Sequence, residues 1–153
     1  MAIRFRGEFF QKTDAKCRLS VPAEFRRALG QHGDQRLVLA QTANSECITI
    51  YPATVWEAYE DRILALPQYK KAIRNLLRLQ IASASEGTPD GHGRVVLAPN
   101  LRAAAAIEAG ADVVVVGQID HFELWQRDRW DAARLAAAAG LDTLDDDLAE
   151  LGL

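Results

Sequence analysis

Short runs of alternating apolar and polar residues, typical of β-strands, fill the first third of the chain. Residues 5–11 form the first run, and a β-rich segment at 18–21 follows a polar turn. Pro22 suits the first turn of a short helix, where its missing N–H costs nothing, and Gly30 is placed to end that helix. A third strand is predicted over residues 36–40.

The next segment completes this pattern and the second half of the chain repeats it. Ile48 and Ile50 alternate with polar residues in a predicted strand at 47–51, and an amphipathic helix follows over 52–66. The corresponding elements of the second half are predicted at 83–88, 94–97, 113–116, 121–125 and 127–139, with Gly110 ending the short helix between them.

The two halves are copies of one motif at a nearly constant offset. Asp14 and Arg18 form a D-x-x-x-R pattern that recurs at Asp90 and Arg94, 76 positions later. The match continues through the short helix and the third strand at the same offset, and the last strand and closing helix match at 74. A single D-x-x-x-R pattern has little meaning, but two in register with the same succession of elements indicate an internal repeat.

This repeat sets the expected organisation of the chain. The first motif covers residues 5–51, connecting helices cover 52–82, the second motif covers 83–125, and a C-terminal helix with an acidic tail covers 126–153. One four-stranded unit is marginal alone, and interleaving two units removes exposed strand edges. We therefore expect an α+β fold in which two tandem, pseudo-symmetric half-motifs form one closed β-barrel with flanking helices.

Charge is distributed unevenly along the 153 residues, whose net charge is −3. The first 27 residues carry seven basic and three acidic groups, and the remaining 126 carry 11 basic and 18 acidic groups. The total argues mildly against a nucleic-acid partner, whereas the asymmetry indicates a local anion-binding face. Lys70, Arg74 and Arg78 form a second basic stripe at spacing four, which is either a solvated helix face, a second phosphate contact or an inter-subunit ion-pair surface.

Other functional classes find little support in the sequence. Two cysteines without CxxC spacing and three scattered histidines predict neither disulfides nor a metal site. Val96 stands where a dinucleotide loop beginning at Gly91 needs glycine. Asp14 and Asp90 each lie beside an arginine, which favours two ionised groups over a proton-sharing catalytic pair. With no signal peptide and no long apolar run, we expect a cytoplasmic protein that is no enzyme and has no cofactor, membrane partner or small-molecule substrate.

Four segments carry a resemblance to the MraZ family: FRGEFF from residue 5, DAKCRLSVPAEFR from residue 14, IYPATVWE from residue 50 and FELWQRDRW from residue 122. The resemblance spans about residues 3–135. It implies a swapped-hairpin β-barrel of the AbrB class with both halves in one chain, and assembly into rings. It also implies a nucleoid-associated transcriptional regulator, often a repressor, that binds short G-containing DNA repeats upstream of its own bacterial division and cell-wall operon.

Two positions depart from the family pattern. Cys17 stands where the family usually has glycine, and a positive φ there would cost on the order of 1–2 kcal/mol. Cys17 is either a tolerated substitution or a redox switch activated by the cations on both sides. His92 replaces a longer polar or basic residue in the second motif, which predicts a weaker or pH-sensitive phosphate contact.

The repeated D-x-x-x-R motif supplies the candidate DNA-binding residues. Arg18 and Arg94 are expected to read bases, because an arginine bonds guanine O6 and N7 through two parallel N–H groups. Asp14 and Asp90 are expected to buttress the turns, by accepting backbone N–H bonds or by holding the arginines. Sequence-independent phosphate contacts are assigned to three further cations: Arg6, Lys12 and Lys16.

Two alternatives remain open at the level of sequence. Each D-x-x-x-R pattern is also typical of a structural ion pair that closes a turn. The whole chain is also compatible with a ring-forming interaction scaffold, or an antitoxin-like module, without DNA specificity of its own.

Overall fold

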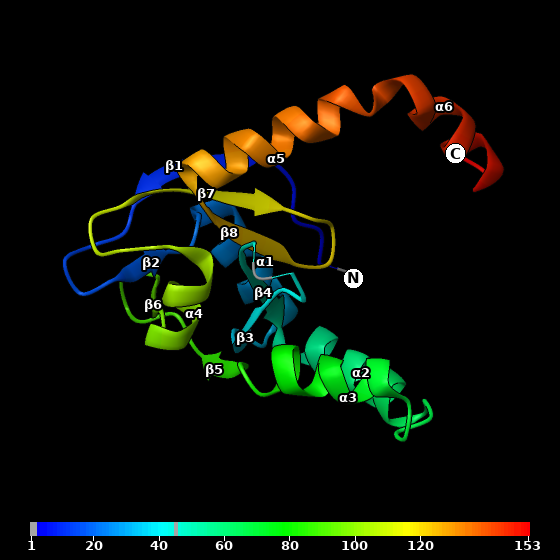
Figure 1. Cartoon of the computed structure of the whole chain (residues 1–153). Coiled ribbons are helices and arrows are strands. Elements are labelled where there is room, and N and C mark those ends of the chain that lie inside the picture. Colours follow the sequence, from blue (N-terminus) through cyan, green and yellow to red (C-terminus); the bar gives the residue numbers. More distant parts are fainter. Residues whose placement is uncertain (1–2, 45) are drawn as a thin grey trace.

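The computed structural model describes residues 3–44 and 46–153 (Figure 1). None of the helices in the described part of the chain has the length and apolar character needed to cross a membrane. The elements in chain order are β1 (Glu8–Lys12), β2 (Arg18–Ser20), α1 (Ala23–His32), β3 (Leu37–Gln41), β4 (Ile48–Pro52), α2 (Ala53–Leu64), α3 (Lys71–Leu76), the π-helical turn η1 (Leu77–Ile81), β5 (Ser85–Gly87), β6 (Arg94–Val96), α4 (Pro99–Ala105), β7 (Asp112–Gly117), β8 (Phe122–Gln126), α5 (Arg127–Ala139) and α6 (Leu141–Glu150).

The two motifs form one antiparallel structure by exchanging their first strands. Six strands form a sheet in the order β1-β7-β8-β4-β3-β5, and β2 and β6 form a separate two-stranded ribbon. Strand β1 of the first motif therefore pairs with β7 of the second, and β5 of the second pairs with β3 of the first. Neither motif has a complete sheet without the other.

The strand register follows a pseudo-twofold axis at the offsets read from the sequence. Phe10 of β1 lies opposite Val114 of β7, and Glu86 of β5 lies opposite Val38 of β3. The second pair is the repeat of the first, because Phe10 and Glu86, like Val38 and Val114, are 76 positions apart. In the ribbon Leu19 lies opposite Val95, its own counterpart at offset 76. The sequence repeat is thus a repeat in space.

One hydrophobic core lies between the inner face of the sheet, the ribbon and helices α1 and α4. Phe5, Phe25 and Phe122 meet at its centre with ring centroids 4.9–5.1 Å apart, and each is at most 3% exposed. Leu19 and Val95 close the core from the ribbon. The core thereby holds the ribbon in a fixed position against the sheet.

The closed barrel predicted from sequence is wrong for the described residues, although the α+β class is confirmed. Strands β1 and β5 are the two edges of an open sheet. Helices α1 and α4 and the ribbon fill the space that barrel closure would require. Both edges are protected, because β5 has only three residues and the guanidinium of Arg127 covers Phe10 on β1 at 4.4 Å.

The ends of two helices and the C-terminal tail also differ from expectation. Helix α1 continues past Gly30 and ends at Gly33, which has φ +85°. Helix α4 ends at Ala106 in the left-handed conformation, before the predicted Gly110. The acidic tail is largely helical, since α6 follows α5 after Gly140 alone.

Candidate nucleic-acid interface

Two turns with the same hydrogen bonds precede the strands of the ribbon. In the first, the Asp14 carboxylate accepts the backbone N–H of Lys16 at 3.0 Å, and the backbone N–H and Nε–H of Arg18 at 2.8 and 2.6 Å. In the second, the Asp90 carboxylate accepts the equivalent bonds: the backbone N–H of His92 at 2.8 Å, and the backbone N–H and Nε–H of Arg94 at 3.0 and 3.1 Å. Each aspartate thus organises its turn and holds the arginine that follows.

These N–H bonds keep both carboxylates ionised. The backbone N–H of Arg94 is the main cause that lowers the pKa of Asp90 to about 2, with the N–H of His92 and the Arg94 side chain adding to it. The backbone N–H of Arg18 lowers the pKa of Asp14 in the same way. Two permanently ionised groups, each bonded to its own arginine, do not form a proton-sharing catalytic pair.

The ribbon presents both arginines on its outer face. Its register places Arg18 opposite Val96 and Arg94 opposite Ser20, with Leu19 and Val95 between them turned into the core. Because side chains alternate between the faces of a strand, Arg18 and Arg94 share the face turned away from the core. They are diagonal neighbours, with Cα atoms roughly 7–8 Å apart in such a pair.

Both arginine side chains remain partly exposed while each is held at one nitrogen. Asp14 and Asp90 engage only the Nε atoms of Arg18 and Arg94, whose side chains are 24% and 29% exposed. In the described part of the chain, the Nη groups of both arginines make no hydrogen bond. A held Nε and open Nη groups orient a planar donor towards an external acceptor.

The position before each arginine adopts a left-handed conformation. Cys17 has φ +55° and Gly93 has φ +76°, so the first turn holds a cysteine in a conformation that favours glycine. Cys17 is only 2% exposed and packs in the core next to the ribbon. This burial leaves the thiol poorly placed for the redox switch considered from sequence, since such thiols are accessible.

The three predicted phosphate contacts lie in different surroundings. Lys16 is exposed in the first turn, beside Arg18, and His92 takes its place in the second. Lys12 is exposed at the end of β1 but its Nζ lies 2.9 Å from the Asp112 carboxylate. Arg6 precedes β1, whose five residues separate it from the first turn by about 16 Å. The structure thus brings Lys16 to the arginines and Arg6 to the opposite end of β1.

Two further cations beside the ribbon were missed by the sequence reasoning. The Nε atoms of Arg26 and Arg102 donate to the carbonyl oxygens of Val21 and Leu97, each at 3.1 Å. A Cβ atom built on Gly93 would lie 2.5 Å from Cδ and Nε of Arg26, so this side chain lies across the second turn. The sequence did contain a signal that could have identified them, because Arg26 and Arg102 are equivalent positions of the repeat, 76 residues apart.

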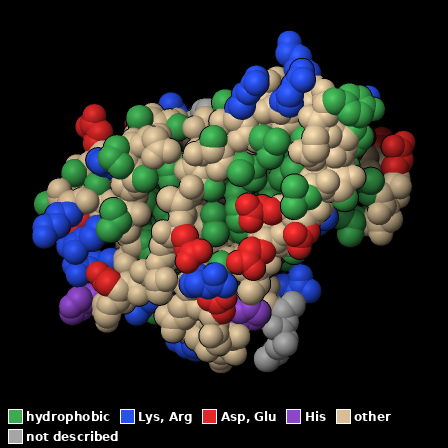
Figure 2. All heavy atoms as spheres, turned by 90° about the horizontal axis from the view of Figure 1, so that it is seen from below, with side chains coloured by type: hydrophobic (Ala, Val, Ile, Leu, Met, Phe, Trp, Pro, Cys, Tyr) green, Lys and Arg blue, Asp and Glu red, His purple; other side chains and the backbone are tan. Residues whose placement is uncertain are grey.

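Basic side chains are a local feature of the surface. Figure 2 shows Lys and Arg side chains gathered in separate groups on one face, with Asp and Glu side chains between them. The net charge of −3 therefore does not describe the surroundings of the ribbon, where Arg18 and Arg94 lie with Lys16 in the first turn and Arg26 across the second.

The family model described as "MraZ protein", whose description also likens it to antitoxins, matches residues 4–79 and 81–149. The chain belongs to the MraZ family. The match confirms the resemblance stated for residues 3–135 and extends it through most of α6. Its two segments correspond to the two structural motifs, each with the helices that follow it.

Curated relatives of the MraZ family match nearly the whole chain. A protein of Acidithiobacillus ferrooxidans is 39% identical over 142 residues, which cover 90% of this chain and 93% of the relative. A Pseudomonas fluorescens protein is 36% identical over 150 residues, which cover 96% and 98%. Both are named Transcriptional regulator MraZ. Membership of the family supports a role in the regulation of transcription.

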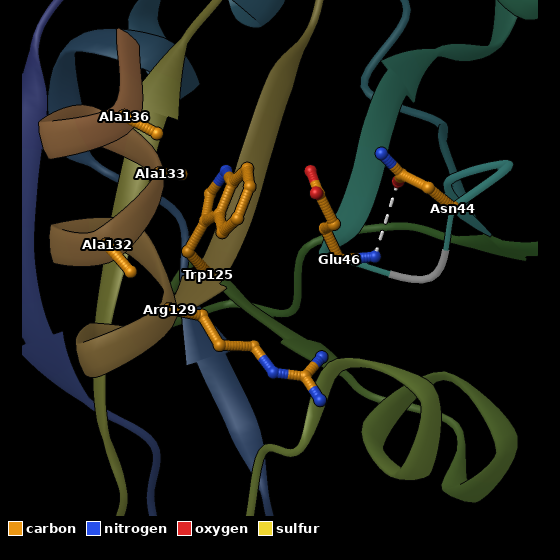
Figure 3. A pocket seen from close by; sticks show the side chains of 7 residues that line it. All are labelled: Asn44, Glu46, Trp125, Arg129, Ala132, Ala133 and Ala136. Atoms are coloured by element: carbon orange, nitrogen blue, oxygen red, sulfur yellow. Dashed lines mark hydrogen bonds between the residues drawn. The ribbon is translucent and has the colours of Figure 1, made fainter. Parts of the chain in front are cut away.

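A pocket away from the ribbon of this MraZ-family chain lacks the residues that a catalytic site needs. It has a volume of about 480 Å³ and lies between α5 and the β3–β4 turn (Figure 3). Its described lining is Asn44, Glu46, Trp125, Arg129, Ala132, Ala133 and Ala136. No histidine, cysteine or hydroxyl group stands among these residues, so they provide no nucleophile with an adjacent base. Within the described residues, no three His, Cys, Asp or Glu side chains are placed to hold a metal ion.

The lowered pKa of Asp90 predicts a pH dependence of stability. A carboxyl whose folded-state pKa lies near 2, below its ordinary 3.8, stabilises the fold above about pH 4, and this contribution is lost as the pH falls towards 2. Asp90→Asn is therefore expected to be less stable than wild type at pH 7, with a difference that shrinks between pH 4 and pH 2. Urea unfolding at pH 7, 4 and 2.5 measures this difference. Asp146→Asn removes the same charge on α6 as a control, and a constant difference across these pH values would contradict the assignment.

Gly93 offers a test of the left-handed turn in this MraZ-family motif. Gly93→Ala is expected to lower the free energy of unfolding by roughly 1–2 kcal/mol, because alanine is strained at φ +76°. Its Cβ atom also displaces Arg26, so DNA affinity should fall as well. Gly91→Ala is the matched control, since a Cβ there meets nothing within 4 Å and φ is not positive. Equal unfolding curves for the two variants would show that the turn tolerates a side chain at Gly93.

Proposed function

We propose that the chain is a sequence-specific transcriptional regulator that binds double-stranded DNA through the outer face of the β2–β6 ribbon. One observation carries the proposal. Arg18 and Arg94 lie as diagonal neighbours on that face, each held at Nε by an ionised aspartate and, among the described residues, without a hydrogen bond at its Nη groups. Arginines of an ordinary structural ion pair have no need of a partly exposed, duplicated arrangement of this kind.

The dimensions and donors of the ribbon suit a DNA groove. The major groove of B-DNA is about 12 Å wide and admits a two-stranded β-ribbon. Arg18 and Arg94 would each bond one guanine through two parallel N–H groups, and each such pair supplies about 1–3 kcal/mol of discrimination. Lys16, Arg26 and Arg102 would contact phosphates on the two sides of the ribbon.

Further parts of the proposal come from the family resemblance. They are a swapped-hairpin fold of the AbrB class, assembly of several copies into a ring, and location at the nucleoid in the cytoplasm. The target would be short repeated boxes upstream of the chain's own division and cell-wall operon, with repression as the outcome. Ring assembly fits such a target, because linked weak modules bind repeated boxes through their effective concentration.

A fluorescence-anisotropy titration tests the proposal. The probe is a labelled duplex from the region upstream of the chain's own gene, compared with a scrambled duplex at about 50 and 200 mM salt. For the three phosphate contacts of Lys16, Arg26 and Arg102, affinity should fall roughly fortyfold between these salt concentrations, and the scrambled duplex should bind more weakly at both. Equal affinity for the two duplexes would remove sequence specificity from the proposal.

The second candidate is a ring-forming or antitoxin-like interaction scaffold. The net charge of −3 and the exposed apolar helix surfaces favour it. A scaffold without DNA specificity would show no binding to either duplex at 50 mM salt, and Arg18→Ala would leave its interactions unchanged.

A further inference from the structure

Helix α6 carries an apolar face that packs into no hydrophobic cluster of the described residues. Leu141, Leu144, Leu148 and Leu151 follow one another at spacings of three and four, so they share one side of the helix. Leu144 is 39% exposed and Leu151 is 77% exposed. An amphipathic helix of this kind is stabilised by a partner surface that covers its apolar side.

The helix that follows the first motif shows what such a cover looks like. A loop of six residues between α2 and α3 lets the chain turn back, and η1 packs on α2 through Ile81 while Gln80 accepts a bond from Tyr59 at 2.6 Å. Between α5 and α6 there is only Gly140, so α6 cannot fold back on α5 in this way. It continues away from the body of the molecule (Figure 1).

The α2–η1 hairpin has an open apolar groove. A cavity of about 150 Å³ between its two arms is lined by Glu60, Ile63, Leu64, Leu77 and Ile81. Leu64 and Tyr69 near the tip of the hairpin are 71% and 75% exposed. Side chains at spacings of three and four on a helix fit such a groove as knobs fit holes.

The two apolar surfaces carry opposite net charge. Residues 53–81 of the hairpin contain five basic and three acidic side chains, with Glu60 in the groove lining itself, and residues 143–153 contain four acidic side chains and no basic one. In the described residues, Lys70, Lys71, Arg74 and Arg78 have no ion-pair partner, and neither do Asp145, Asp146, Asp147 and Glu150. Opposite charge around complementary apolar surfaces fixes the orientation of a contact.

We propose that α6 of one copy docks into the groove of the α2–η1 hairpin of a second copy. The two surfaces lie at opposite ends of the sheet, α6 at the top of Figure 1 and the hairpin at the bottom, so the contact joins different copies. Each copy thereby offers one α6 and one groove, which is a head-to-tail contact that closes into a ring or extends as a filament. The inference rests on the self-assembly in the proposed function and names its surfaces.

Helical geometry makes the contact testable by charge reversal. Asp145 and Asp147 flank the leucines of α6, while Asp146 and Glu150 lie on the opposite side of the same helix. Asp145→Lys/Asp147→Lys should weaken self-association at least tenfold, and so should Arg74→Glu/Arg78→Glu on the hairpin. Asp146→Lys/Glu150→Lys has the same charge change and should have little effect. Analytical ultracentrifugation of the full chain measures the association.

The decisive arm combines both reversals in one chain, which should restore association because the two charge patterns are exchanged. Unchanged association in both single-surface variants would overturn the proposed contact while self-assembly stands. Equal losses from the flanking and the opposite-face variants of α6 would also overturn it. A wild-type chain that stays monomeric would remove self-assembly itself. In every arm, anisotropy with a duplex holding one box reports DNA binding separately, because the ribbon takes no part in the contact.

Discussion

Arg18→Ala/Arg94→Ala is expected to lower affinity for the specific duplex roughly a thousandfold, since each arginine–guanine pair contributes about 1–3 kcal/mol. Each single variant should lose about half of this free energy, because the two turns are equivalent in the structure. The fold should persist, since Asp14 and Asp90 keep their backbone N–H bonds in the absence of the arginine side chains. Anisotropy titrations at one salt concentration measure the loss.

Two controls separate base reading from charge. Arg4→Ala/Arg134→Ala removes two exposed basic groups away from the ribbon and should change affinity little. Arg18→Lys/Arg94→Lys keeps the charge but loses the planar fork, so salt dependence should remain while discrimination against the scrambled duplex falls. A lysine variant that discriminates as well as wild type would show that the two arginines act only as point charges.

Phe122→Ala is expected to give the largest loss of stability, about 3–5 kcal/mol in the free energy of unfolding. Phe122 is fully buried, and its ring lies 5.1 Å from Phe5 and 5.0 Å from Phe25. It belongs to β8 of the second motif, while both neighbours belong to the first, so its removal opens the contact between the two halves. Because a domain of this size is stable by about 5–15 kcal/mol, this is a large fraction of the total.

Urea denaturation followed by circular dichroism measures this loss. Phe10→Ala is the matched control, because Phe10 is 53% exposed on the edge strand β1 and its loss leaves no internal cavity. Phe122→Leu keeps most of the volume and should cost less than about 1.5 kcal/mol, which provides a readout if the alanine variant does not fold. A loss below 1 kcal/mol in the alanine variant would show that the two halves are not held together at this point.

Pseudo-twofold symmetry connects the fold to its proposed partner. The ribbon lies on the pseudo-twofold axis, with Leu19 and Val95 facing each other across it. Duplex DNA also has twofold axes that relate its two strands, so a symmetric ribbon can present equivalent donors to both. The symmetry is broken where Lys16 of the first turn is replaced by His92 of the second, which predicts stronger phosphate binding at the first turn.

Much of the local structure followed from residue order. The D-x-x-x-R repeat predicted two pseudo-symmetric half-motifs, and its offset of 76 recurs in the register of the sheet and of the ribbon, because equivalent sequences form equivalent strands. The limits of α5 were predicted to the residue. The predicted ends of α1 and α4 were wrong: α1 ends at a later glycine, Gly33, and α4 ends at Ala106, in a left-handed conformation that sequence preferences assign to glycine.

The sequence by itself determined that two copies of one motif share a single fold, and that each places an arginine after an aspartate-organised turn. Only the tertiary structure decided that the six-stranded sheet stays open, that Arg6 lies away from the ribbon and that Arg26 lies across the second turn. The physical reason is the range of the interactions. Turn bonds and strand periodicity depend on neighbours within a few residues, whereas sheet closure and side-chain gathering depend on how distant elements share one core.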